Sequence, residues 1–222
     1  MPQALNYNII CNNLFTNKNF SFSRFGDGEW FCIFKALGIK KITTNCNTDK
    51  HNYFTDLGKR LASVVKNEPL YFFGMQTLAL SIMNDTIIHF IKGLKLKIVN
   101  GDILHTASIK GRLQLFFDSL SNRKVLLVGN DSLLQLKKVQ AKLVTIPRYN
   151  CWQKYEQIKS TLKNNIKPNT VVLYCASMMT EVLIDDLWNI YKDTITQIDC
   201  GSLFDPYVGR KTRTYHKNLE VK

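Results

Sequence analysis

The sequence of 222 residues contains no apolar run of the ~18 residues that a membrane-spanning helix needs. Its first residues, MPQALNYNIICNN, also lack a basic segment that leads into an apolar core, which is the pattern of a secretory signal. We therefore expect a cytoplasmic protein with no transmembrane segment.

The cysteines lack the paired spacing of a zinc site, because no C-x-x-C is present. A disulfide framework is not expected either, since a chain of this length buries an adequate core and shows no secretion signal. We predict that most of these thiols are small buried hydrophobic groups. The six positions are Cys11, Cys32, Cys46, Cys151, Cys175 and Cys200.

Repeats, low-complexity segments and linkers rich in proline or glycine are all absent, so we expect one domain over residues 1–222. The phosphate-binding motif G-x-x-x-x-G-K-[ST] is missing, and no G-x-G-x-x-G follows the first predicted strand. These absences argue against a P-loop ATPase and against a dinucleotide-dependent oxidoreductase.

Acidic residues are scarce: 17 Asp and Glu stand against 30 Lys and Arg, which gives a net charge of +13. Such a charge attracts polyanions, so nucleic acid, an anionic membrane surface and phosphorylated substrates are all candidate partners. The lysines are spread along the chain rather than clustered, which also fits a compositional bias that has no bearing on binding.

Short apolar runs alternate with longer stretches of helical periodicity. This alternation predicts βαβ units and a Rossmann-like, doubly wound α/β fold, with a mostly parallel sheet and helices on both faces. The runs are short and rich in Val, Ile, Leu and aromatic residues, as strands buried on both faces are. The predicted strands are Phe20–Phe25, Leu70–Phe73, Leu96–Val99, Lys124–Val128, Leu143–Ile146, Thr170–Cys175 and Thr194–Ile198.

Four stretches between these runs place apolar residues on one face of a helix. The four predicted faces are Leu57, Leu61, Val64 and Val65; Leu78, Ile82, Ile87 and Phe90; Leu113, Phe116, Phe117 and Leu120; and Val182, Leu183, Leu187 and Ile190.

Small and polar residues follow most of the predicted strands, at the edge of the sheet where open parallel sheets bind ligands. They include Gly26–Glu29, Asn100–Asp102, Gly129–Ser132, Ala176–Met178 and Asp199–Ser202. Each group alone also fits an ordinary turn with a helix cap. Their convergence on one edge predicts a binding cleft there.

The sequence S-R-F-G-D-G-E-W at residues 23–30 is the sharpest element. Asp27 and Glu29 form a D-x-E pair that can offer hard oxygen ligands to Mg²⁺ or Mn²⁺, which in turn neutralises a diphosphate. Arg24 can pair with the same phosphates. Glycines at 26 and 28 allow close approach of a ligand. The alternative is a turn in which Asp27 caps the next helix.

The R-F-G-D-G-E segment at the end of an N-terminal strand resembles the signature of the GT-D-type glycosyltransferases. The resemblance implies a Rossmann-like domain that uses the D-x-E motif and a divalent metal, Mn²⁺ or Mg²⁺, to hold a nucleotide-sugar, and we expect a UDP-sugar. It makes Asp27 and Glu29 the metal and diphosphate residues, and Arg24, Gly26 and Gly28 parts of the donor pocket. Asp27 is thereby also a catalytic residue.

Glycosyl transfer needs a base for the acceptor hydroxyl and a cation for the departing diphosphate. The predicted base is Asp102, although a helix N-cap explains this residue equally well. Its neighbours at the sheet edge are alternatives: His105, Glu181, Asp199 and Asp205.

Further donor contacts are expected from Asn130, Ser177 and Arg210. Arg210 belongs to an irregular, basic and aromatic C-terminal segment, residues 199–222. This segment either folds over the sheet edge and supplies cations to the diphosphate, or packs across the domain as a solvated tail. The polar stretch 45–51 is a second segment that could close over the site.

Two classes of acceptor fit the sequence. The basic charge favours a polyanion, for example phage DNA that carries hydroxymethylated pyrimidines, and the location would then be the host cytoplasm. A glycan or polysaccharide intermediate is the other acceptor class. The alternatives to a transferase are a non-enzymatic nucleic-acid-binding protein and a different phosphate-handling enzyme that uses the same D-x-E pair.

Overall fold

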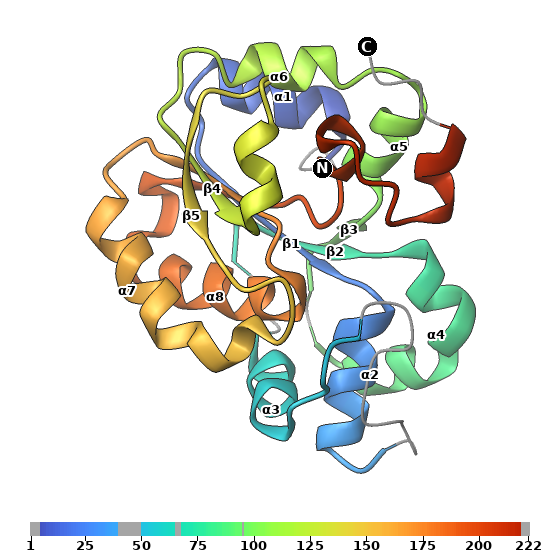
Figure 1. The fold of residues 1–222 in the computed structure, drawn as a ribbon. Coiled ribbons are helices and arrows are strands. Elements are labelled where there is room, and N and C mark those ends of the chain that lie inside the picture. Colours follow the sequence, from blue (N-terminus) through green and yellow to red (C-terminus); the bar gives the residue numbers. More distant parts are fainter. Residues whose placement is uncertain (1–4, 40–49, 65–67, 95, 219–222) are drawn as a thin grey trace.

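The computed structural model describes residues 5–39, 50–64, 68–94 and 96–218. In these parts of the chain, seven strands form one parallel sheet in the order β3-β2-β1-β7-β6-β4-β5 (Figure 1). The strands are β1 (Ser21–Phe25), β2 (Tyr71–Met75), β3 (Ile98–Asn100), β4 (Val125–Gly129), β5 (Ala141–Thr145), β6 (Val171–Tyr174) and β7 (Thr196–Asp199).

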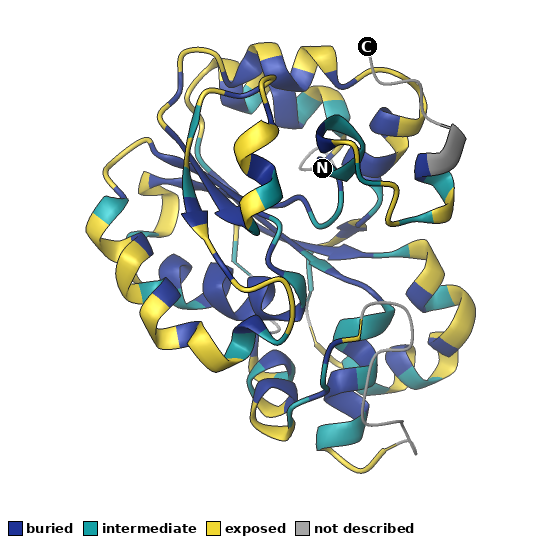
Figure 2. Cartoon of the chain, in the orientation of Figure 1, coloured by how far each residue is buried: buried dark blue, intermediate teal, exposed yellow. Residues whose placement is uncertain are grey.

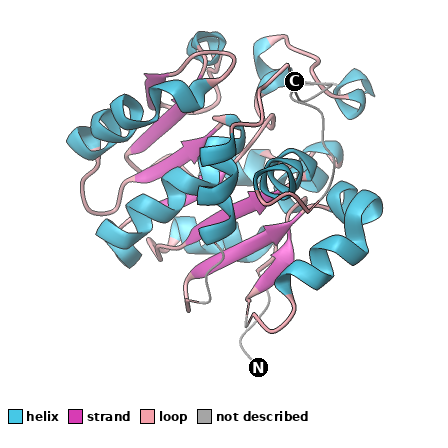
Figure 3. Ribbon diagram, turned by 90° about the horizontal axis from the view of Figure 1, so that it is seen from below, coloured by secondary structure: helices cyan, strands magenta, loops and turns pink. Residues whose placement is uncertain are grey.

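All seven predicted strands are confirmed, with ends that differ by at most two residues. Strands β1, β2, β4, β6 and β7 are almost completely buried, since helices cover both faces of the sheet (Figures 2 and 3). This burial explains why these runs are continuously apolar rather than alternating. The predicted fold class is therefore confirmed.

Eight α-helices connect and cover the strands within the described ranges. They are α1 (Tyr7–Phe15), α2 (Asp27–Ala36), α3 (Thr55–Ser63), α4 (Thr77–Ile91), α5 (Ile103–Ile109), α6 (Gln114–Ser119), α7 (Tyr155–Asn165) and α8 (Thr180–Tyr191). Two apolar cores result, one on each side of the sheet. Residues of α2, α3, α4, α7 and α8 form the first core, and residues of α1, α5 and α6 form the second.

The predicted helix faces fall in α3, α4, α6 and α8. The faces of α3 and α6 are buried as expected, apart from Val65, which lies outside the described residues. The face of α4 was predicted only in part: Ile87 is buried as expected, but Leu78 and Ile82 are exposed, and Ala79 and Met83 complete the buried face.

On α8 the buried face is larger than predicted but excludes one expected member. Val182, Leu183 and Leu187 are buried, as expected, whereas Ile190 near the end of the helix is half-exposed.

The order in which the parallel strands are added to the sheet reverses between β1 and β7. Strands β1 to β3 are added outward on one side, and the chain then crosses to build β4 to β7 on the other side. Ligands in open α/β sheets bind at the carboxyl ends of the strands next to such a reversal. Here those ends belong to β1 and β7, which carry Arg24 and Asp199.

Candidate active site

A cleft of about 930 Å³ lies at the carboxyl ends of the strands. Nearly all of the sequence-predicted site residues line it, although they come from distant parts of the chain. The lining includes Arg24, Asp27, Gly28, Glu29, Asp102, Asn130, Ser177 and Arg210, whereas Gly26 is buried beneath it.

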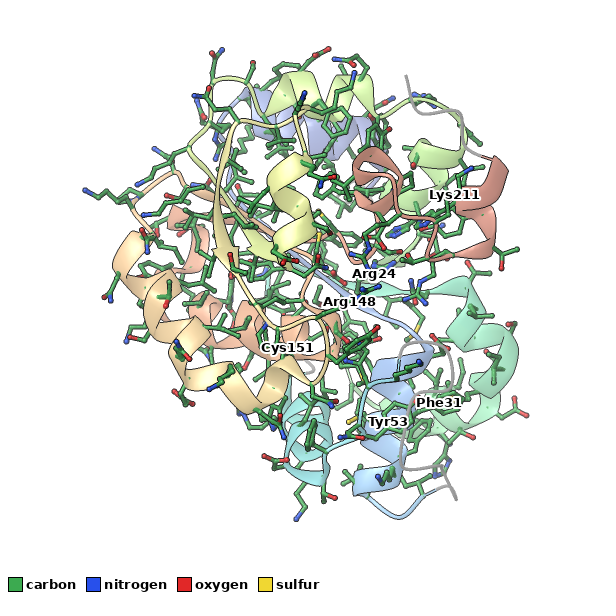
Figure 4. All side chains as sticks on the ribbon, viewed as in Figure 1. Arg24, Phe31, Tyr53, Arg148, Cys151 and Lys211 are labelled. Atoms are coloured by element: carbon green, nitrogen blue, oxygen red, sulfur yellow. The ribbon has the colours of Figure 1, made fainter. Side chains whose placement is uncertain are left out.

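Arg24 is the central charged group of this cleft, and Figure 4 labels it together with Arg148, another lining residue. Its Nε lies 3.3 Å from Asp199 Oδ2, and its Nη1 lies 3.3 Å from His105 Nδ1. With its amide oxygen turned toward the guanidinium, Gln76 accepts from Nη1 and from Nη2, the latter at 3.2 Å. The guanidinium is thus fixed by side chains from three elements.

Burial alone would lower the pKa of Arg24, but the negative charges of Asp199 and Glu29 outweigh it and raise this pKa. His105 responds in the opposite way, since burial and the adjacent Arg24 charge hold its pKa well below the usual range. His105 is therefore neutral, and because the guanidinium can only donate, Nδ1 is the acceptor and Nε2 carries the proton.

Glu181, at the start of α8, is buried next to this arginine. Its Oε1 accepts from the backbone N–H of Arg24 at 3.4 Å. Burial raises the pKa of Glu181 well above its usual range, and the charges of Asp199 and Glu29 add to the effect. Asp199 itself accepts from the backbone N–H of Gly201 at 2.8 Å. The environment of Glu181 therefore favours its neutral form, next to the ion pair of Arg24 and Asp199.

The D-x-E motif forms the first turn of α2. Gly26 is the N-cap, and its backbone N–H donates to Glu29 Oε2 at 2.8 Å, as in a capping box. Burial and the nearby Asp199 charge raise the pKa of Glu29 to about 7. Neither Gly26 nor Gly28 has a positive φ. A Cβ at Gly26 would lie 1.9 Å from the Gln76 amide, so a larger residue there would displace the side chain that accepts from Arg24.

Asp27 is the first residue of α2 and not its cap. It lines the cleft and forms no hydrogen bond or ion pair with the described residues. In the described parts of the chain, no group of three or more His, Cys, Asp or Glu side chains is arranged to hold a metal ion. A Mg²⁺ or Mn²⁺ ion that is bound by one or two carboxylates and by substrate phosphates needs no such group. The Asp27 and Glu29 oxygens fit that mode of binding.

Asp102 lines the cleft on the opposite side of Arg24 from β7. Its Oδ2 accepts from the backbone N–H of Thr77 at 2.9 Å, so this oxygen caps α4, while Asp102 itself is the N-cap residue of α5. Its Oδ1 has no hydrogen-bond partner among the described residues. Asp102 thus has the helix-capping role that was one of its two interpretations. Its Oδ1 atom is not used by this cap.

Asn130, Ser177 and Arg210 line the cleft on the side of β4 and β6. The Asn130 side chain caps the 3-10 helix η1 (Asp131–Gln135) by accepting from Ser132 N at 3.1 Å. Arg210 donates to Ser132 Oγ at 3.2 Å and pairs with Asp205 at 3.4 Å. Ser177 has a φ of +55°, which is uncommon for a residue with a Cβ and is found at functional sites.

The C-terminal segment folds over the carboxyl edge of the sheet, whereas its supply of cations to a diphosphate stays a prediction. It carries the 3-10 helices η5 (Asp205–Val208) and η6 (Thr214–Asn218), and five residues from Arg210 to Tyr215 line the cleft. The Tyr215 ring packs edge-on against His105, with centroids 5.9 Å apart. Residues 219–222 lie outside the described part, as do residues 45–49 of the other predicted closing segment, whereas Lys50 and His51 line the cleft.

Sequence reasoning missed several lining residues. Gln76 was overlooked because the second strand was expected to end at Phe73, whereas it continues to Met75 and so places Gln76 at the sheet edge. Leu78 was assigned to a buried helix face, and Thr106 and Ile109 carried no motif. Gln76 could have been identified from the correct end of the second strand, and Leu78 from the correct assignment of the buried helix face.

The cleft is not strongly basic, although the whole chain is. Among the described residues, its lining contains five basic and five acidic side chains: Arg24, Lys50, Arg148, Arg210 and Arg213 against Asp27, Glu29, Asp102, Asp199 and Asp205. The described lining therefore contributes nothing to the excess charge of the chain.

Within the described residues, no helix is both long enough and apolar enough to cross a membrane. The sequence matches no family model and no curated protein.

The fold, in contrast, is shared with solved structures. One is described as the highly conserved domain of unknown function 1792, with a distinct glycosyltransferase fold; it has a TM-score of 0.67 and 15% identity, over 96% of this chain and 88% of that one. A selenomethionine-substituted structure of the same domain gives 0.66 and 16%, with the same coverage. The chain thus has the fold of a domain that is described as a distinct glycosyltransferase fold.

Proposed function

We propose that the protein is a metal-dependent glycosyltransferase that moves a sugar from a nucleotide-sugar, a UDP-sugar, to an acceptor hydroxyl. The observation that carries this proposal is the placement of Asp27 and Glu29 beside Arg24 in a cleft of about 930 Å³ at the reversal point of the sheet. The glycosyltransferase-type fold of the structural neighbours supports the same reaction class.

In this proposal Asp27 and Glu29 hold Mn²⁺ or Mg²⁺ together with the oxygens of the donor diphosphate. The ion supplies charge stabilisation for the departing nucleoside diphosphate. Arg24 supplies a second positive charge from the protein itself. Since Asp199, His105 and Gln76 fix its guanidinium before a donor binds, little reorganisation is needed when charge develops on the leaving group.

The nucleoside end of the donor fits the side of the cleft near β4, β5 and β6. Tyr149 and His51 lie there with ring centroids 5.7 Å apart, and the Arg148 guanidinium lies 5.5 Å from the Tyr149 ring centroid. Aromatic rings of this kind can stack on a nucleotide base, and the neighbouring Arg148 guanidinium can pair with a phosphate. Asn130, Ser177 and Arg210 line the same side and complete the proposed donor contacts.

Asp102 is the proposed base for the acceptor hydroxyl. The hydrogen bond from Thr77 holds one oxygen of this carboxylate in place, and the other oxygen is available to take a proton. Glu181 is less suited to this role because it is buried and is not part of the cleft lining, and Asp199 is paired with Arg24. General-base assistance of this kind contributes typically ~10²–10⁴-fold to a rate.

A reaction assay tests this proposal. The purified protein is incubated with Mn²⁺ and a panel of nucleotide-sugars, and release of the nucleoside diphosphate is measured alongside inorganic phosphate. The expected result is slow release of UDP from one UDP-sugar, which Asp27→Ala abolishes. Release of inorganic phosphate instead would favour the alternative phosphate-handling enzyme.

DNA with hydroxymethylated pyrimidines is a second candidate acceptor beside a glycan, and the net charge of +13 favours it. Phage-encoded enzymes would meet such DNA in the host cytoplasm. A gel-shift titration at low and at physiological salt measures this binding directly. Binding that weakens steeply with salt supports a DNA acceptor or a nucleic-acid-binding protein, and the UDP-release assay separates these two.

A further inference from the structure

One face of α5 presents three different chemical groups to the cleft. Asp102, Thr106 and Ile109 are spaced four and three residues apart, so they lie on the same side of the helix, and all three line the cleft. Ile109 is 54% exposed although it is aliphatic. The helical rise places it ~10 Å from Asp102 along the axis.

A second exposed aliphatic side chain reaches the same end of the cleft from α4. Leu78 is 55% exposed and lines the cleft, and it follows Thr77, whose backbone N–H donates to Asp102. Leu78 and Ile109 thus extend an aliphatic surface away from the carboxylate that we propose as the base. Exposed apolar side chains within a cleft, unlike isolated ones elsewhere on a surface, mark a ligand-binding surface.

The two ends of the cleft differ in chemistry. Aromatic and cationic groups, including Tyr149 and Arg148, line the end near β5, and the aliphatic pair lines the end near α4 and α5. Arg24 lies between them as a paired, charged group. The volume of about 930 Å³ is at the upper end of the ~300–1,000 Å³ typical of ligand sites, so it accommodates a donor and part of an acceptor together.

We propose that the end of the cleft between α4 and α5 is the acceptor subsite, and that it takes an acceptor with an aliphatic chain attached on the far side of the sugar or alcohol that carries the reactive hydroxyl. This inference rests on the proposed function. The hydroxyl lies at Asp102, the polar part of the acceptor lies along Thr106, and the aliphatic chain covers Leu78 and Ile109.

The test compares two acceptor probes on the full chain saturated with UDP and Mn²⁺. Octyl β-D-glucoside, kept below its micelle concentration, and methyl β-D-glucoside are titrated by calorimetry. We expect the octyl compound to bind at least tenfold more tightly, since only it reaches Leu78 and Ile109. The double variant Leu78→Ser/Ile109→Ser should weaken octyl glucoside binding about tenfold, or about 1.4 kcal/mol.

A matched double variant controls for loss of surface aliphatic groups. Ile88→Ser/Ile190→Ser removes two side chains of similar exposure, 51% and 50%, that are not part of the cleft lining, and it should bind both glucosides as the wild type does. If the double variant does not fold, the single variants Leu78→Ser and Ile109→Ser replace it in the test. Each should show a smaller loss of octyl glucoside affinity than the double variant.

The outcomes separate the acceptor subsite from the donor site. UDP binding is measured first, and its absence would contradict the proposed function itself. If UDP binds but the two glucosides bind equally, or neither binds, or the octyl preference survives in the Leu78 and Ile109 variants, the acceptor subsite is wrong.

Discussion

Arg24 near the end of β1 and Asp199 at the end of β7 form an ion pair, with 3.3 Å between Arg24 Nε and Asp199 Oδ2. The two strands are parallel neighbours at the point where the order of strand addition reverses. Both side chains are largely buried, with 11% and 7% of their surface exposed. This pair ties the two halves of the sheet together and at the same time fixes a cation at the floor of the cleft. Stability and the proposed donor binding should therefore depend on the same contact.

Asp199→Ala should destabilise the protein by about 3 kcal/mol or more, because removal of one partner leaves a buried charge uncompensated. Urea denaturation measures this change. The control is Lys192→Ala, which breaks an ion pair with Glu68 whose side chains are 49% and 31% exposed. That exposed pair should contribute less than about 1 kcal/mol. Equal effects of the two variants would contradict the assignment.

Glu181→Gln should change how stability depends on pH. Burial, with the charges of Asp199 and Glu29, raises the pKa of Glu181 well above its usual range, so the folded state keeps a proton that the unfolded chain releases above its ordinary pKa of about 4.3. Folding therefore becomes less favourable as pH rises through the interval between the two values.

Glutamine resembles the protonated carboxyl, so Glu181→Gln should be at least as stable as the wild type at pH 8. The free energy of unfolding of this variant should also decrease less steeply with rising pH than that of the wild type. The measurement is the urea midpoint at several pH values from 5 to 8. Glu156→Gln, at an exposed position on α7, is the control and should leave the profile unchanged. Identical profiles for Glu181→Gln and wild type would refute a buried, protonated Glu181.

Gly201→Ala should disturb both the backbone and Arg24. Gly201 has a φ of +50°, and a Cβ there would lie 2.4 Å from Arg24 Nη2. The backbone strain alone costs about 1–2 kcal/mol, and displacement of the guanidinium adds a loss of donor affinity. Gly111→Ala is the matched control, since Gly111 has a φ of +65° but open space around its Cβ position. Similar donor binding by both variants would exclude steric support of Arg24 by this glycine.

The strands could be predicted because each buried strand is a short apolar run that ends in small or polar residues. The run before Gly129, for example, is buried at every position, so its pattern is unambiguous. Helix phase was harder to predict. On α4, Leu78 and Ile82 have the same hydrophobicity as core residues, and composition alone does not reveal that both are exposed and that Leu78 lines a cleft.

The candidate site was predictable to the extent that parallel strands end at one edge. That rule brings Asp27, Asp102 and Ser177 into one cleft, as observed. It does not reveal which groups contact each other. The burial of Glu181 beside Arg24 and the Arg24–His105 contact depend on side-chain directions across distant segments, which a sequence pattern does not encode.

The most direct test of the central claim is the binding of nucleotide-sugars to wild type, Asp27→Ala and the control Asp85→Ala, with and without Mn²⁺, measured as a thermal shift. Asp85 is an exposed carboxylate on α4, outside the cleft lining. We expect a UDP-sugar to raise the melting temperature of wild type and Asp85→Ala only when Mn²⁺ is present, and to leave Asp27→Ala unchanged. A shift of the same size in Asp27→Ala, or no shift with any nucleotide-sugar in the wild type, would contradict the proposed donor site.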